Sequence, residues 1–101
     1  MRKRGYPIVR YCIAGSLGAE RVIRGRPAET LLELHKRGEK GVVAFDFKGG
    51  PAYRLASYVH LLKKANLDIV KRSERHDCGQ HARYYLKSPV SILSADWHPK
   101  T

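Results

Sequence analysis

The segment from Pro51 to Ala65 carries the most regular pattern in the chain. Its apolar side chains recur at intervals of three and four residues, the spacing of one face of an α-helix, at Ala52, Leu55, Ala56, Val59 and Leu62. The opposite side carries hydroxyl, imidazole and basic groups, from Tyr53, Arg54, Ser57, Tyr58, His60, Lys63 and Lys64. The pattern predicts an amphipathic helix with a cationic outer face, and its alanines predict close packing against a second helix.

After Asn66 the pattern changes from helical spacing to alternation. Apolar and polar residues alternate over residues 67–72, and a second stretch of strand-forming residues covers 82–86. The polar segment between them contains Gly79, which suits the loop of a hairpin. The sequence therefore predicts a β-hairpin over about residues 68–88.

A second helix is predicted over residues 28–37. Pro27 suits the first turn of a helix, and Gly38 suits a left-handed stop after the last one. The side chains expected on its buried face are Ala28, Leu31, Leu32 and His35. The apolar run over residues 41–47 fits either a strand or a short buried helix, and the glycines and proline of residues 48–51 predict a turn.

Basic residues are concentrated in two parts of the chain. The 101 residues include 20 Lys and Arg against 9 Asp and Glu, a net charge of +11. Residues 1–26 hold seven basic residues and one acidic residue, and residues 51–88 hold eight and three, whereas 27–50 and 89–101 are balanced. Such a surplus is typical of proteins whose partner is a polyanion. We therefore expect the cationic helix, the hairpin and the N-terminal segment to contact nucleic acid.

The first 26 residues allow two interpretations. β-Branched and aromatic residues lie on both sides of the glycine-containing segment 15–18, which favours two short strands paired as a hairpin. A flexible basic arm that follows a DNA backbone is the alternative. A basic tail with little order at residues 1–4 is a further alternative, and we expect partial order from Tyr6 onward.

The order of these elements is that of a winged helix-turn-helix. The stretch from Val43 to Leu86 also resembles a bacterial and phage family of small winged-helix domains. The residues that carry this resemblance are RLASYVHLLKK at 54–64, Asp68-Ile69 and Arg83-Tyr84-Tyr85-Leu86. The resemblance implies that residues 54–64 form a recognition helix and that the hairpin is the wing.

The chain departs from that family at three positions. Val42 or Val43 stands where the second helix of such domains commonly begins with a Thr or Ser cap. Asn66 stands where glycine is usual, and asparagine also tolerates a left-handed backbone. Lys71 stands where threonine is common. The resemblance does not extend to residues 1–26.

The expected fold is therefore α+β: a winged helix-turn-helix with a three-helix core and a C-terminal β-hairpin wing. We expect a basic N-terminal extension over residues 1–26, a winged-helix DNA-binding domain over 27–93 and a C-terminal tail over 94–101. The tail contains enough apolar residues to pack back onto the domain.

The resemblance and the charge pattern together imply how double-stranded DNA would be held. A recognition helix enters the major groove, and a basic wing follows the backbone. The residues expected to contact DNA are Lys48, Tyr53, Arg54, Ser57, Tyr58, Lys63, Lys64, Lys71, Arg72, Arg75 and Arg83. Alternatives stay open: Arg54 could pair with Asp46 or Glu39, Tyr58 could pack under the wing, and the wing cations could simply be solvated.

No catalytic constellation is visible, so we expect neither an enzyme nor a cofactor. A phosphate-binding glycine loop and a carboxylate pair are both missing from the sequence. His76, Cys78 and His81 do not have the paired spacing of structural zinc ligands, so we expect no metal. Cys12 and Cys78 are both expected to be reduced thiols.

These expectations fit a cytoplasmic, nucleoid-associated protein, either a transcriptional regulator or a phage-type accessory protein. The apolar run near the N-terminus is short and interrupted by Arg10, unlike a signal peptide, and no stretch is long enough for a membrane span. The same basic face would suit a protein-interaction module with an acidic partner, or an RNA binder. Whether one chain or a homodimer binds stays open.

Overall fold

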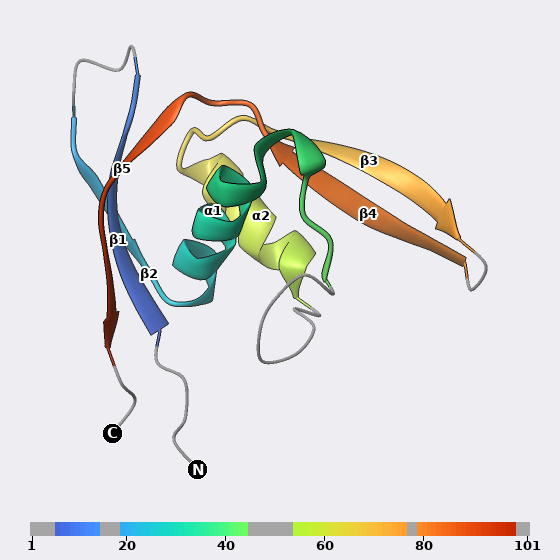
Figure 1. The fold of residues 1–101 in the computed structure, drawn as a ribbon, viewed down its shortest axis with the longest axis horizontal. Helices are drawn as coiled ribbons and strands as arrows, with labels where there is room; N and C mark the ends of the chain where they lie inside the picture. The colour runs from blue at the N-terminus through green and yellow to red at the C-terminus, as the bar shows by residue number, and fades with distance from the viewer. Residues whose placement is uncertain (1–5, 15–18, 45–53, 77–78, 99–101) are drawn as a thin grey trace.

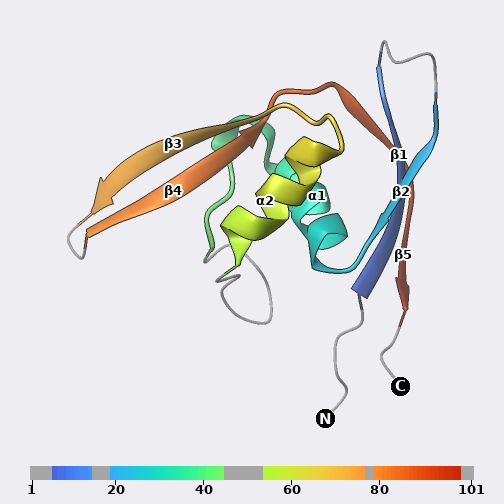
Figure 2. The same cartoon turned by 180° about the vertical axis from the view of Figure 1, so that it is seen from behind.

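The computed structural model describes residues 6–14, 19–44, 54–76 and 79–98. The elements in chain order are β1 (Tyr6–Ile13), β2 (Arg21–Arg24), α1 (Arg26–Arg37), the 3₁₀ helix η1 (Gly38–Lys40), α2 (Leu55–Lys64), β3 (Ile69–His76), β4 (Gly79–Leu86) and β5 (Val90–His98). The two α-helices lie between a three-stranded sheet of order β2-β1-β5 and the β3–β4 hairpin, which projects away from them (Figure 1). Figure 2 shows the same arrangement from behind.

The helix predicted over residues 28–37 is confirmed as α1, which begins two residues earlier. A proline stands in its first turn, and the backbone N–H of Gly38 (φ 51°) donates to the carbonyl oxygen of Leu34 at its end. The predicted buried face was only partly right. Ala28 and Leu31 are fully buried, but His35 is exposed and Leu34 is buried instead.

The reason is that α1 is covered on more than one side. It contacts β1 and β2 of the three-stranded sheet and also α2 and β4. Glu29 and Thr30 are therefore buried as well, and both have polar partners. Glu29 pairs with Arg26 at 3.0 Å, and the Thr30 hydroxyl donates to the Arg26 carbonyl oxygen at 2.9 Å. Helical spacing of apolar residues predicts one buried face, so it could not predict a helix that is buried on two sides.

The predicted N-terminal pair of strands is confirmed. β1 and β2 pair antiparallel from Ile8↔Arg24 to Tyr11↔Arg21. Val9 and Tyr11 belong to the hydrophobic core, so residues 6–13 are part of the packed fold and not a flexible arm. Residues 1–5 lie outside the described ranges.

The third strand of this sheet comes from the other end of the chain. β5 pairs antiparallel with β1, from Tyr6↔His98 to Ile13↔Val90, with a register shift between Arg10 and Tyr11. Residues assigned in sequence to the extension, the domain and the tail thus share one sheet. Where the domain boundaries lie stays a prediction.

The predicted hairpin over residues 68–88 is confirmed as β3 and β4, which pair from Ile69↔Leu86 to His76↔Gly79. The predicted loop was too long, because residues 73–76 and Gly79 belong to the paired strands. On the free side of β4, Val42 and Tyr84 exchange two backbone hydrogen bonds of 2.9 Å each. Val42 therefore makes strand-type pairing, one of the two alternatives for this run, and residues 45–47 lie outside the described ranges.

α2 confirms the predicted amphipathic helix from Leu55 onward. Leu55, Val59 and Leu62 are buried, and their spacing is that of one helical face. Ala56 was wrongly placed on that face. It is exposed, so it does not mediate close packing against a neighbouring helix. The core joins side chains from both helices, both sheets and Val42.

Within the described ranges, α1 and α2 are the two α-helices. A three-helix core is therefore not shown. The third helix was expected in the apolar run 41–47, of which residues 45–47 lie outside the described part. No helix among the described residues has the length and apolar character that a membrane span requires.

Candidate nucleic-acid interface

The exposed side of α2 carries a continuous ridge. Because Leu55, Val59 and Leu62 are buried, and a helix turns about 100° per residue, Ser57 and Lys64 stand opposite them, with His60 and Leu61 about equally far to either side. Ser57, Leu61 and Lys64 follow one another along α2 at intervals of four and three residues, and so form one row. All three side chains are exposed. We call these three residues the α2 ridge. Arg54 and His60, also exposed, flank it on its two sides.

The predicted contact residues of this segment fall into three groups. Arg54, Ser57, Lys63 and Lys64 are exposed, whereas Tyr58 is only partly exposed. Lys48 and Tyr53 lie outside the described residues. Leu61 was not among the predicted contact residues, because the prediction selected polar and basic side chains on this face of the helix. Its position four residues after Ser57 was the available signal.

α2 is cationic without compensating acids. Residues 54–64 contain no Asp or Glu. Arg54 forms no ion pair with Glu39, which was one of its alternative roles, while Asp46 lies outside the described ranges. Lys63 and Lys64 stand in the last turn of α2, where positive charge also stabilises the helix dipole.

The end of α2 fixes the path from the helix into the wing. Asn66 adopts a positive φ of 68°, as its identity predicted. Its N–H donates to the carbonyl oxygen of Lys63 at 3.0 Å, and the N–H of Leu67 donates to that of Leu62 at 3.2 Å. These bonds form a Schellman motif, with Leu62 and Leu67 both buried. The motif leads directly to Ile69 at the start of β3.

The wing cations divide between the two faces of the hairpin. Lys71 lies opposite the buried Tyr84, so Lys71 and Arg75 share the face that packs onto the core at the base of the hairpin. Arg72 and Arg83 lie opposite each other on the other face. The sequence predicted these four cations as one group, whereas the register separates them into two pairs.

Arg83 has a structural role in the described fold. Its Nε donates to the Glu74 carboxylate at 2.8 Å, and its Nη1 donates to the backbone oxygen of Lys40 at 3.0 Å. The first bond crosses the hairpin, and the second ties β4 to η1. The predicted contact between Arg83 and DNA stays a prediction.

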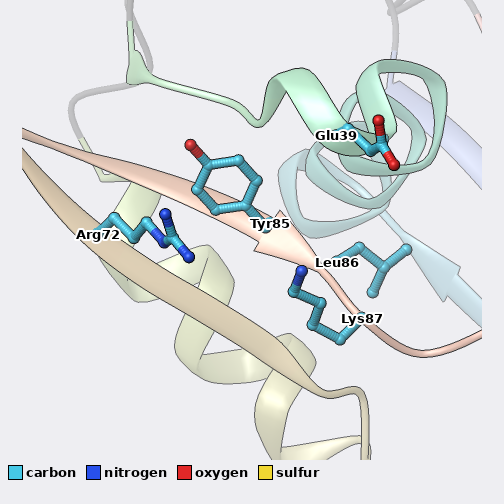
Figure 3. A pocket seen from close by; sticks show the side chains of 6 residues that line it. Glu39, Arg72, Tyr85, Leu86 and Lys87 are labelled. Atoms are coloured by element: carbon cyan, nitrogen blue, oxygen red, sulfur yellow. The ribbon is translucent and has the colours of Figure 1, made fainter.

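Arg72 contacts an aromatic ring on the same face. The charged groups of Arg72 and Lys87 each lie 5.8 Å from the centroid of the Tyr85 ring, within cation–π range (Figure 3). A hollow of about 350 Å³ adjoins this ring, lined by Gly38, Glu39, Arg72, Tyr85, Leu86 and Lys87. Its charges are mixed, and it lies on the face of the hairpin opposite to Tyr84, Lys71 and Arg75.

Burial changes the acid–base behaviour of the Tyr84 phenol. Desolvation by burial raises the pKa of its phenol above 10.0. No group of three or more His, Cys, Asp and Glu that could hold a metal is found among the described residues. Cys12 carries a free thiol, and Cys78 lies outside the described ranges.

Comparison with known proteins identifies one similarity. A family model described as a winged helix domain matches residues 20–96, well over half of the chain. The matched region includes β2, both helices and the hairpin. No curated protein and no solved structure matches the chain.

Proposed function

The chain belongs to the winged helix domain family, and on that premise we propose that it binds double-stranded DNA. α2 is the recognition helix that enters the major groove, and the β3–β4 hairpin is the wing that lies along the backbone. The observation that carries the proposal is the α2 ridge with its flanking Arg54: exposed cations and a hydroxyl on a helix without acidic residues.

The dimensions of α2 support this role. Its 10 residues span about 15 Å, and the major groove is about 12 Å wide, so the ridge can reach base edges while the helix ends meet phosphates. Ser57 and Arg54 would contact bases or phosphates from the first half of the helix, and Lys63 and Lys64 would contact phosphates near its end.

Lys71 and Arg75 are the wing residues best placed to act with α2. They share the hairpin face of Tyr84, whose side chain belongs to the same core as Val59 and Leu62 of α2. Arg72 and Arg83 lie on the other face and would reach DNA only if the backbone wraps around the hairpin. We therefore assign the main phosphate contacts of the wing to Lys71 and Arg75.

The decisive experiment compares two charge reversals that differ only in position. Lys64 and Lys36 are both exposed, and both stand in the last turn of an α-helix, α2 and α1 respectively. Lys64→Glu and Lys36→Glu therefore change net charge and helix-dipole energy alike. Duplex binding is measured by fluorescence anisotropy at 50 and 200 mM salt. Between these concentrations, the affinity of a protein that binds DNA phosphates falls steeply, because binding releases counterions.

We expect wild-type affinity to fall steeply with salt, roughly tenfold weaker binding for Lys64→Glu, and near-wild-type binding for Lys36→Glu. Equal losses in the two variants would mean that only total charge matters and that α2 is not the contact surface. Duplex affinity that does not depend on salt would contradict the proposal as a whole.

The cellular role we propose is that of a non-catalytic transcriptional regulator or phage-type accessory protein, acting as one chain or as a homodimer. The same surface could serve an acidic protein partner or RNA. Competition separates these partners: random-sequence duplex, single-stranded RNA and a polyacidic protein are each titrated against a labelled duplex. Displacement by the polyacidic protein at concentrations where unlabelled duplex fails would favour the interaction-module alternative.

A further inference from the structure

Leu61 is an apolar side chain at the centre of the α2 ridge. It is 48 % exposed, and it lies between Ser57, one turn earlier, and Lys64, one turn later. The other exposed positions of α2 and of its N-cap carry polar, charged or small side chains, namely Arg54, Ala56, Ser57, His60, Lys63 and Lys64. Leu61 is therefore the one large apolar group that the described part of α2 presents outward.

Leu61 lies outside the hydrophobic core. It belongs neither to the buried cluster nor to the partly buried side chains packed against it. The other large apolar side chains that are exposed in the described residues, Val22, Val70 and Leu93, lie on strands. Leu61 is thus the large exposed apolar side chain on the helix proposed to enter the groove, and it is available for a contact outside the core.

The major groove of DNA offers an apolar partner for such a side chain. The edges of guanine, cytosine and adenine present hydrogen-bond donors and acceptors there, whereas thymine adds the C5 methyl group. Cytosine gains the same apolar group when it is methylated at C5. When the α2 ridge enters the groove, Leu61 loses its water, and a pyrimidine C5 methyl is the apolar partner that a base edge can offer.

We infer that Leu61 is a specificity-determining residue that reads a pyrimidine C5 methyl group. This inference rests on the proposed function, because it requires α2 to lie in the major groove. Ser57 and Lys64, on the turns before and after, would make polar contacts on either side of the methyl. Leu61 would then select the base at the centre of the contacted site, while Lys64 adds affinity at any sequence.

The test changes only the C5 methyl group. A tight-binding duplex is selected from a random pool with the wild-type protein, and each thymine of the site is replaced in turn by uracil, which keeps base pairing. In a second set, each cytosine is replaced by 5-methylcytosine. Wild-type affinity should fall about three- to tenfold at one uracil position if thymine is read, or rise by a similar factor at one 5-methylcytosine position if methylated cytosine is read.

The same duplexes are then measured with two leucine variants. Leu61→Ala should bind the methylated and unmethylated members of the sensitive pair equally. Leu93→Ala is the matched control, because Leu93 is 51 % exposed but lies on β5 in the three-stranded sheet. Leu93→Ala should keep the wild-type preference. Because Leu61 is outside the core, we expect Leu61→Ala to fold, and circular dichroism verifies this.

The outcomes separate this inference from the proposed function. Salt-dependent duplex binding without sensitivity to any methyl group would overturn the inference and leave the proposed function intact. A methyl preference of equal size in wild type and Leu61→Ala would also overturn it, because another residue would then read the methyl. If no duplex binds, the proposed function fails, and the inference fails with it.

Discussion

Arg21 on β2 donates a hydrogen bond from Nη1 to the backbone carbonyl oxygen of Ala65, over 2.8 Å. Ala65 is the residue that caps the C-terminal end of α2, where unpaired carbonyl groups carry partial negative charge. The guanidinium group therefore satisfies an acceptor at the end of the proposed recognition helix. It also joins the three-stranded sheet to that helix across 44 residues of sequence.

Replacing this guanidinium should weaken both the fold and the interface. Arg21→Met keeps the aliphatic stem but removes the donor, and we expect the free energy of unfolding to fall by about 1.5–3 kcal/mol, as for other hydrogen bonds that involve a charged group. Duplex affinity should also fall, because α2 is held less firmly against the sheet. Urea denaturation and anisotropy measure the two effects.

Arg24→Met provides the control for Arg21→Met. Arg24 lies on the same strand, is exposed, and loses the same charge. We expect its free energy of unfolding to change by less than about 0.5 kcal/mol, as at most surface positions. Similar stability losses in the two variants would show that the bond to Ala65 is not what Arg21 contributes.

Gly41 lies where the chain passes closely over β4. A Cβ at this position would stand 2.7 Å from Cγ of Arg83 and 2.8 Å from Cε2 of Tyr85, and the backbone φ of Gly41 is 73°. Gly41→Ala thus combines a backbone conformation that side chains disfavour with steric overlap. We expect a loss of about 3 kcal/mol in the free energy of unfolding.

Gly38→Ala separates the two contributions. Gly38 also has a positive φ, 51°, but a Cβ there meets no atom within 4 Å. Its loss should be confined to the backbone cost of about 1–2 kcal/mol. Thermal or urea unfolding of both variants gives the comparison, and a Gly41→Ala loss no larger than that of Gly38→Ala would contradict the close packing over β4.

The local patterns of the sequence predicted the elements well. Helical spacing located α1 and α2, alternation located β3 and β4, and Asn66 was expected to tolerate the left-handed backbone that it adopts. These features depend on neighbours within a few residues, which a sequence displays directly. The winged-helix resemblance agrees with the family match over residues 20–96.

Long-range relationships could not be predicted in the same way. The pairing of β5 with β1, the burial of Glu29 and the bond from Arg21 to Ala65 all depend on which elements become neighbours in space. In the candidate interface, alternation along β3 alone puts Lys71 and Arg72 on opposite faces, but the packing of the hairpin decides that Lys71 is the one on the face of Tyr84. A count of basic residues cannot distinguish them.

The two faces of the wing lead to opposite expectations for two arginines. Arg83 bonds with Glu74 and with the Lys40 carbonyl, so Arg83→Met should lower the free energy of unfolding by about 1–2 kcal/mol. Arg75 is exposed on the face of Tyr84. Arg75→Met should leave stability unchanged but reduce the slope of log affinity against log salt by about 0.9, the value for one phosphate contact.

These two variants are each other's control, since each removes one guanidinium from the hairpin. Denaturation and salt titration are run on both. An unchanged salt slope in Arg75→Met would remove Arg75 from the interface. A stability loss in Arg75→Met equal to that in Arg83→Met would contradict the expectation that only the arginine bonded to Glu74 and Lys40 stabilises the fold.

The buried phenol of Tyr84 predicts a loss of stability at alkaline pH. Burial raises its pKa above 10.0, so the folded protein retains this proton to higher pH than the unfolded chain does. The contribution is complete below the unfolded pKa. As pH rises above about 10, the unfolded chain loses the proton first, and the free energy of unfolding falls until the folded pKa has been passed.

Tyr84→Phe removes this contribution and isolates it from the lysines that titrate in the same range. The variant should lose less stability than wild type between about pH 9 and about pH 11. The difference in tyrosinate absorbance between wild type and Tyr84→Phe gives the titration of this phenol directly in the folded state. A midpoint at or below the usual value of 10.0 would contradict the burial of the Tyr84 side chain, and with it the packing that joins the wing to the core.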